Sequence, residues 1–101
     1  MNAKSGKRQS IFWSHSNKDS KLVKAIVSSI KRKLKGIEHY LSEEDCQVGH
    51  IPKKIMRKID NSICVVAVLT PNGMSSAWVL NEIGYAKGRR KLVIPLTEKY
   101  E

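Results

Sequence analysis

Trp78, Glu82 and Tyr85 combine residue types and spacing that suggest chemistry. Their spacing of i, i+4 and i+7 places them on one face of a helix that begins near Ser75 or Ser76. A carboxylate on such a face is costly to bury without a partner. In a structural interpretation, Trp78 belongs to the core and Glu82 reaches the rim, where it pairs with a lysine or arginine. In a functional interpretation, Glu82 faces a cleft and stabilises positive charge in a substrate, beside an apolar or stacking wall formed by Trp78. The pattern alone leaves both open.

A second group of polar side chains, Ser14, His15 and Ser16, follows a short apolar run. Adjacency cannot make them a nucleophile–base pair, because successive side chains on an extended segment point in opposite directions. The sequence also lacks the G-x-S-x-G segment that presents a nucleophilic serine in many hydrolases. The hydroxyl and backbone N–H groups could instead hold a phosphate near a helix N-terminus, or cap the helix that follows.

The acidic cluster formed by Glu43, Glu44 and Asp45 could bind a metal, but nothing at suitable spacing completes a set of ligands. We therefore expect no metal site. Neither of the common glycine-rich phosphate loops is present, and we expect no resident cofactor. The sparse aromatic residues do not interleave with the basic ones, so nucleic acid is not an expected partner.

Length and composition fit one folded domain without a membrane span. The chain has 101 residues, of which 41% are hydrophobic, and a formal net charge of +10. Residues 1–35 contain ten of the basic residues and one acidic residue, Asp19. Such a basic surface attracts nucleic acid, acidic partners or phosphates, or simply keeps a small domain solvated. The longest apolar run, Ile63 to Leu69, is too short to cross a membrane, and Cys46 and Cys64 do not make a disulfide framework. We expect a cytoplasmic protein.

Apolar periodicity predicts alternating strands and helices along the chain. The apolar residues of three segments recur at helical spacing, and four short runs have strand composition. Strands are predicted at residues 11–13, 37–41, 63–69 and 92–96, and helices at residues 22–34, 52–59 and 76–88. Gly36 is expected to end the first helix, and Thr70–Gly73 to form a turn. This order indicates an α/β fold, with a parallel sheet of four strands and helices on both faces.

Ligands of such sheets bind beyond the carboxyl ends of the strands, where the winding direction reverses. If the first and third strands are neighbours, this point lies between Ser14–Ser16 and the turn that leads to Trp78. Glu82 is then expected at the lip of a crevice.

Three segments in this order resemble a Toll/interleukin-1 receptor (TIR) domain of the prokaryotic type. Ile11-Phe12-Trp13-Ser14-His15-Ser16 resembles the first family box, with Asp19 opening the first helix. Asp45-Cys46-Gln47-Val48-Gly49 resembles the second box, and Ser76-Ala77-Trp78-Val79-Leu80-Asn81-Glu82 resembles the Ser-x-Trp-x-x-x-Glu segment. The resemblance covers roughly residues 10 to 96.

The resemblance implies a flavodoxin-like, three-layer fold and one of two functions. Many members of the family are modules that recruit other TIR domains. Others hydrolyse NAD to nicotinamide and ADP-ribose or a cyclic isomer, in prokaryotic defence or signalling among other settings. NAD is then the substrate, and Glu82 matches the catalytic glutamate. Trp78 would be a wall of the pocket, bordered by Ser14, His15 and Ser16.

The resemblance assigns the loop residues Asp45, Gly49 and His50 to gating of the pocket or to assembly with another TIR domain. The sequence departs from the family at Val48, where proline is usual, and it stops after the fourth strand. We expect a basic tail at residues 1–9 and a truncated or minimal TIR-like domain at residues 10–101. Pairing with another copy could cover the edge left by the missing fifth strand. A deoxyribosyltransferase, which shares the sheet and a ribose-directed glutamate, is a further alternative.

Overall fold

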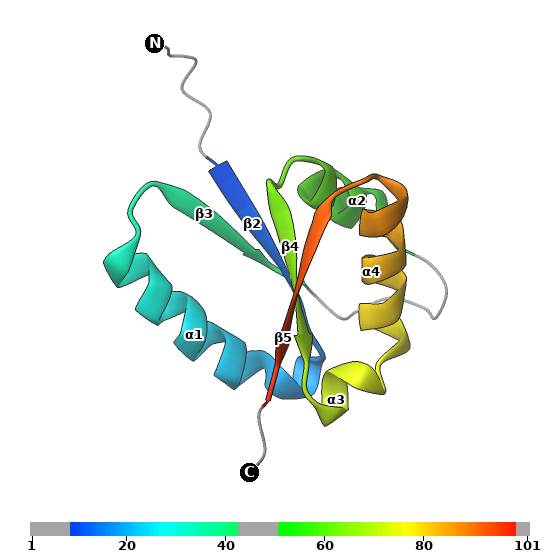
Figure 1. Ribbon diagram of the computed structural model, residues 1–101, viewed down its shortest axis with the longest axis horizontal. Helices are drawn as coiled ribbons and strands as arrows, with labels where there is room; N and C mark the ends of the chain where they lie inside the picture. The colour runs from blue at the N-terminus through cyan, green and yellow to red at the C-terminus, as the bar shows by residue number, and fades with distance from the viewer. Residues whose placement is uncertain (1–8, 43–50, 99–101) are drawn as a thin grey trace.

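The computed structural model describes residues 9–42 and 51–98. Its centre is a parallel sheet of four strands in the order β3-β2-β4-β5 (Figure 1). The strands are β2 (Gln9–Ser14), β3 (Ile37–Leu41), β4 (Cys64–Leu69) and β5 (Leu92–Thr97). The predicted parallel sheet and the adjacency of the first and third strands are therefore confirmed. All four carboxyl ends lie at the same edge of the sheet.

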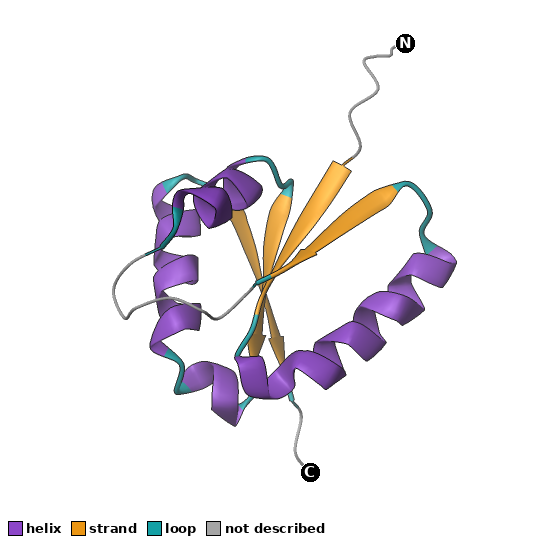
Figure 2. Ribbon diagram, turned by 180° about the vertical axis from the view of Figure 1, so that it is seen from behind, coloured by secondary structure: helices purple, strands orange, loops and turns teal. Residues whose placement is uncertain are grey.

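Helices cover both faces of the sheet, as the flavodoxin-like arrangement requires (Figure 2). Valines of one core pack beneath α1 (Ser20–Lys33), with Trp13 among them. The opposite core contains residues of α2 (Lys53–Asp60) and α4 (Ala77–Gly88) together with Phe12. Two shorter elements, η1 (Asn17–Asp19) and α3 (Pro71–Met74), follow β2 and β4 at the carboxyl edge.

The strand β4 is the best-buried element of the sheet. It reads as apolar without alternation because side chains on both of its faces enter a core. Val65 belongs to the core beneath α4, whereas Val66 and Val68 belong to the core beneath α1. The strand thereby holds the two helical layers to one sheet.

The segment Thr70–Gly73, which the sequence predicts as a turn, leads into a one-turn helix. The Thr70 side chain accepts a hydrogen bond from the Gly73 backbone N–H at 3.1 Å, and Pro71 occupies the first turn. The backbone passes so close to β4 that a Cβ at residue 73 would lie 2.0 Å from the Val68 carbonyl oxygen. Only glycine fits there without a shift of backbone.

The remaining boundaries differ from the predicted ones by small amounts. The helix α1 ends at Lys33 with Leu34 as its C-cap, and Gly36, with φ of +82°, turns the chain towards β3 two residues later. The strand β5 continues to Thr97, so Pro95 lies inside it, and β5 is an edge strand as its proline indicates. Within the described residues, no helix has the length and apolarity needed to cross a membrane.

Candidate active site

The fold brings together Ser14 and Glu82, which are 68 residues apart in the sequence. The Ser14 hydroxyl donates a hydrogen bond of 2.5 Å to Oε1 of Glu82. Both side chains are completely shielded, with exposed fractions of 0%. The contact lies where β2 ends and α4 packs against it, at the carboxyl edge of the sheet, and Glu82 is buried there instead of standing at the lip of a crevice.

Local sequence explains why these two side chains meet. Side chains alternate along a strand, so Ser14 points to the same face as Phe12, which packs in the core beneath α4. Ser76 begins α4 by accepting a hydrogen bond from the Val79 backbone N–H. This start places Glu82 on the helix face that meets β2, so the carboxylate does not reach the rim expected from the structural interpretation.

Trp78, one helical turn before Glu82, packs in the same core. Its exposed fraction is 6%, and it lies in the cluster that contains Phe12, Ile59 and Val65. Among the described residues its indole Nε1 has no hydrogen-bond partner. The indole is therefore part of the core beneath α4, and its predicted role as a wall of the pocket stays a prediction.

Tyr85 takes no part in this site, although it shares the spacing of Trp78 and Glu82. Its hydroxyl donates to both carboxylate oxygens of Asp60, at 3.0 and 3.1 Å, near the amino ends of the strands. Burial and this hydrogen bond raise the pKa of the Tyr85 hydroxyl above its ordinary value.

Arg89 also donates to the Asp60 carboxylate, and Lys91 Nζ donates to the carbonyl oxygens of Asp60 and Ser62. We call these five residues the Asp60 cluster.

His15 and Ser16 are buried beside Ser14, but their described contacts are made with other residues. The His15 backbone N–H and carbonyl both bond the hydroxyl of Ser42, at 3.2 Å each, which ties the ends of β2 and β3 together. Nδ1 of His15 lies 2.8 Å from the Ser16 carbonyl oxygen. The Ser16 hydroxyl caps η1 by accepting from the Lys18 backbone N–H. The sequence left open whether this segment holds a phosphate or caps a helix. The described contacts of Ser16 are those of a helix cap.

Asp19 is a buried carboxylate whose contacts the sequence does not predict. It accepts hydrogen bonds from the Thr70 hydroxyl, at 2.5 Å, and from the Asn72 amide, at 3.2 Å. These bonds join η1 to α3 at the carboxyl edge of the sheet. The sequence does place an acidic residue, Asp19, after one strand, and a hydroxyl and an amide residue, Thr70 and Asn72, after the neighbouring strand. This pairing is the sequence signal that could have indicated the contact.

His39 and Trp13 form a polar contact on the other face of the sheet. Trp13 Nε1 donates to Nδ1 of His39 at 3.0 Å, so the neutral ring carries its proton on Nε2. Burial and, to a smaller extent, the charge of Lys31 lower the pKa of His39 from 6.5. The acceptor role of Nδ1 requires this neutral form.

The loop residues Asp45, Gly49 and His50 lie outside the described residues, so their predicted role in gating or assembly stays a prediction. Within residues 9–42 and 51–98, no group of three or more histidine, cysteine or acidic side chains is arranged to hold a metal ion.

Comparison with known proteins identifies the family to which the chain belongs. The family model for the TIR domain matches residues 11–101, and the chain belongs to this family. No curated protein is significantly similar in sequence. One similar solved structure comprises the TIR domains of the activated Roq1 resistosome, which directly recognises the pathogen effector XopQ. It is 22% identical, with a TM-score of 0.69, and the match covers 92% of this chain and 59% of the other. At this identity the likeness shows the fold.

Proposed function

We propose that this TIR domain hydrolyses NAD to nicotinamide and ADP-ribose or a cyclic isomer, as part of cytoplasmic defence or signalling. The buried contact between Ser14 and Glu82 carries the proposal, since it holds a carboxylate at the carboxyl edge of the sheet, where such folds bind ligands. Membership of the TIR family supports the assignment, because Glu82 matches the glutamate of its NAD-cleaving members. The similarity to the TIR domains of a resistosome supports a role in defence.

The carboxylate acts by stabilising charge that develops in the transition state. As the bond between C1′ of the ribose and the nicotinamide nitrogen breaks, its electron pair leaves with the nitrogen, which becomes neutral. Positive charge then develops on the ribose at C1′ and the ring oxygen, and the negative charge of Glu82 stabilises it more than it stabilises the ground state. In hydrolysis, water adds its oxygen to C1′ and releases a proton. Nicotinamide needs no general acid, because it is already cationic in NAD.

The surrounding residues orient this carboxylate and control access to it. The Ser14 hydroxyl holds one oxygen of Glu82, and Trp78 supplies an apolar wall that keeps water from the carboxylate. Because Glu82 is fully shielded, NAD reaches it only after the residues that cover it move apart. We therefore propose that catalysis requires a conformational step, driven by NAD itself or by association with another TIR domain.

Nicotinamide release from NAD tests the proposal. The wild-type chain is incubated with NAD over a range of protein concentrations, in parallel with Glu82→Gln, which keeps the size of the side chain and removes its charge. We expect Glu82→Gln to lower turnover roughly 100-fold or more, as for other groups that stabilise a transition state. The matched control is Glu38→Gln, which removes the same charge from an exposed position on β3. Absent wild-type turnover, or turnover that survives Glu82→Gln unchanged, contradicts the proposal.

A second candidate function is a non-enzymatic module for TIR–TIR contacts, which the complete burial of Glu82 favours. Concentration-dependent assembly that is lost when residues 45–50 are replaced, without any NAD turnover, would select this function. A strict monomer that turns over NAD would exclude it.

A further inference from the structure

The hydrolysis proposed above releases a proton, and few of the described groups at the carboxyl edge of the sheet can take it. Each carboxylate oxygen of Asp19 already accepts a hydrogen bond, one from Thr70 and the other from Asn72. Oε1 of Glu82 accepts one from Ser14. A proton on Glu82 would also remove the negative charge that stabilises the transition state. Neither carboxylate is therefore suited to accept the proton.

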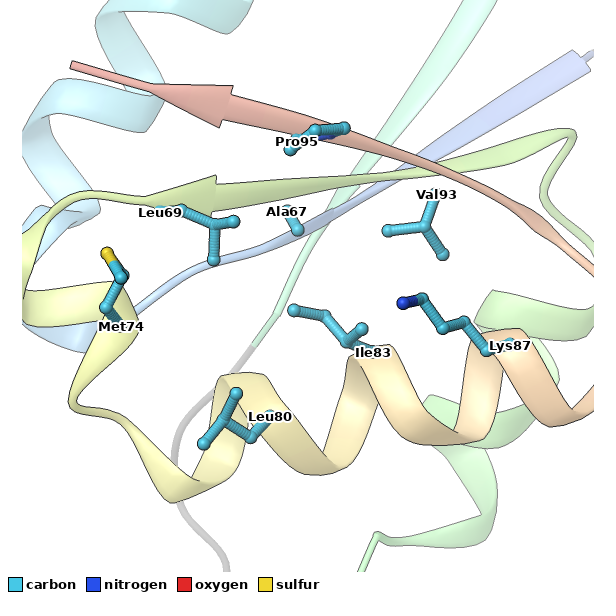
Figure 3. A pocket seen from close by; sticks show the side chains of 8 residues that line it. All are labelled: Ala67, Leu69, Met74, Leu80, Ile83, Lys87, Val93 and Pro95. Carbon is cyan, nitrogen blue, oxygen red and sulfur yellow. The ribbon is translucent and has the colours of Figure 1, made fainter. Parts of the chain in front are cut away.

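The apolar groove beside α4 offers no acceptor either. It has a volume of about 450 Å³ and lies between α4 and the strands β4 and β5 (Figure 3). Among the described residues that line it, Lys87 alone has a polar side chain, and an ammonium group has no lone pair to accept a proton. The acceptor has to belong to another part of the carboxyl edge.

His15 carries a buried nitrogen without a partner among the described residues. The exposed fraction of the side chain is 3%. Its Nε2 is shielded from solvent, and nothing within residues 9–42 and 51–98 forms a hydrogen bond with it. An unpaired buried polar atom costs about 1–3 kcal/mol, so its presence points to a bound water, a ligand or a catalytic role.

The contacts of His15 fix which ring nitrogen has the lone pair. Nδ1 lies 2.8 Å from the Ser16 carbonyl oxygen, which can only accept, so Nδ1 carries the proton and Nε2 of the neutral ring is an acceptor. The same carbonyl accepts from the Asp19 backbone N–H at 2.9 Å. The Ser42 hydroxyl holds the His15 backbone through both its N–H and its carbonyl oxygen. The ring is thereby oriented by a third group, as a general base requires.

His15 directly follows the residue that holds the carboxylate. The strand β2 ends at Ser14, and consecutive Cα atoms are about 3.8 Å apart. The contact of Nδ1 with the next carbonyl oxygen turns the ring along the chain, past the end of the strand. One residue thus anchors Glu82, and the next one supplies a basic nitrogen at the same edge of the sheet.

We propose, resting on the hydrolysis proposed above, that His15 is the general base of this reaction. Nε2 takes a proton from water while the water oxygen forms its bond to C1′ of the ribose. The bond between C1′ and the nicotinamide nitrogen breaks, and its electron pair leaves with the nitrogen. The imidazolium that results keeps its hydrogen bond from Nδ1 to Ser16 and then returns the proton to solvent. Glu82 keeps its negative charge throughout.

Two reactions of NAD separate proton transfer from bond cleavage. Formation of ADP-ribose consumes water and releases a proton. Exchange of isotopically labelled nicotinamide into NAD adds a pyridine nitrogen that carries no proton. His15→Asn keeps a donor near the position of Nδ1 and removes the acceptor at Nε2. We expect it to lower ADP-ribose formation roughly 100-fold or more and to leave nicotinamide exchange within about threefold of wild type.

A second variant separates proton uptake from hydrogen bonding. His15→Gln places near the position of Nε2 an oxygen that accepts a hydrogen bond but cannot hold the proton, so ADP-ribose formation should fall as in His15→Asn. Retained nicotinamide exchange shows that each variant is folded. The matched control is His39→Gln, which replaces the histidine that contacts Trp13 on the other face of the sheet. It should change neither reaction at neutral pH.

The outcomes distinguish this inference from the function on which it rests. Equal losses of the two reactions in the His15 variants, or no loss of either, overturn the inference and leave the proposed function standing. Full ADP-ribose formation by His15→Gln also overturns it, because the residue then only accepts a hydrogen bond. A wild-type chain that neither releases nor exchanges nicotinamide contradicts the proposed function, and this inference with it.

Discussion

The hydrogen bond from Ser14 to Glu82 joins two side chains that solvent does not reach. Leaving a buried hydrogen-bonding group without its partner costs about 1–3 kcal/mol. We therefore expect Ser14→Ala to lower the free energy of unfolding by about 1–3 kcal/mol. Urea denaturation monitored by circular dichroism measures the change.

A matched control for this variant is Ser28→Ala, because Ser28 is exposed on α1. Its free energy of unfolding should stay within about 0.5 kcal/mol of the wild-type value. A comparably small effect of Ser14→Ala would mean that the hydroxyl does not support the buried carboxylate.

The contact between Trp13 and His39 predicts a dependence of stability on pH. The pKa of His39 lies below 6.5 in the folded chain, so the unfolded chain takes up the proton first as pH falls. The stability that neutral His39 contributes is therefore present above about pH 6.5 and is lost as pH falls through the lowered pKa of the folded state. Protonation also converts Nδ1 from an acceptor into a donor, which breaks the bond from Trp13.

Thermal unfolding across this pH range checks the prediction for His39. His39→Gln removes the titrating ring, so the variant should lose less stability than wild type between neutral pH and pH 5. Parallel pH profiles for the two proteins would contradict the assignment of this loss to His39.

At the scale of elements, the close passage of α3 over β4 predicts opposite effects for two glycines. Gly73→Ala would place its Cβ 2.0 Å from the Val68 carbonyl oxygen, and relief of that contact requires a backbone shift. We expect a destabilisation of roughly 1–3 kcal/mol, typical of overpacking, measured as a lowered denaturation midpoint.

Gly84→Ala is the matched control. Nothing lies within 4 Å of the Cβ that it would add, and residue 84 is inside α4. Alanine there should stabilise the chain by about 0.5–1 kcal/mol, because glycine loses more backbone entropy in a helix. If both variants lowered stability equally, helix propensity and close contact would not be the deciding effects.

The contacts of Asp19 predict that η1 and α3 stabilise each other. Asp19→Ala removes the acceptor for the Thr70 hydroxyl and the Asn72 amide, so we expect a loss of about 2 kcal/mol in unfolding free energy. Glu38→Ala, at an exposed position, should change stability little. A loss no greater than that of Glu38→Ala would mean that these bonds do not hold the two elements together.

The elements themselves were largely predictable, because their apolar periodicities are regular. The unbroken apolar run Cys64–Leu69 predicts a strand buried on both faces, and α1 follows the recurrence of its valines and isoleucines. The one-turn helix α3 was predicted as a turn, since Thr70–Gly73 satisfies the residue preferences of both. The contact of Gly73 with β4 decides between a turn and a one-turn helix, and the local sequence does not reveal that contact.

The candidate site was predictable in part for a similar reason. Helical spacing groups Trp78 with Glu82, and the strand order places both near Ser14. Spacing alone also groups Tyr85 with them, yet Tyr85 lies almost one turn further along α4, where its hydroxyl reaches Asp60 at the end of α2. The contacts of Asp19 and Ser42 depend on which loops meet in space, so local pattern could not supply them.

For the molecule as a whole, burial is uneven across the sheet, which predicts uneven protection of backbone amides. Five of the six residues of β4 are buried, whereas none of those of β5 is. In a dilute, monomeric sample we expect amides of β4 to exchange roughly 100-fold or more slowly than those of β5. Hydrogen exchange read by mass spectrometry measures both segments in one experiment.

A β5 as protected as β4 in the dilute monomer would contradict the prediction.

The Asp60 cluster anchors only one end of α4. It holds the helix at Tyr85 and Arg89, near the amino ends of the strands, whereas Trp78 and Glu82 lie towards the other edge. A helix of this length spans about 18 Å, so a small rotation about the anchored end produces its largest displacement at Trp78. That end is itself held in the core, so Glu82 is uncovered only when Trp78 leaves the core and the hydrogen bond from Ser14 breaks.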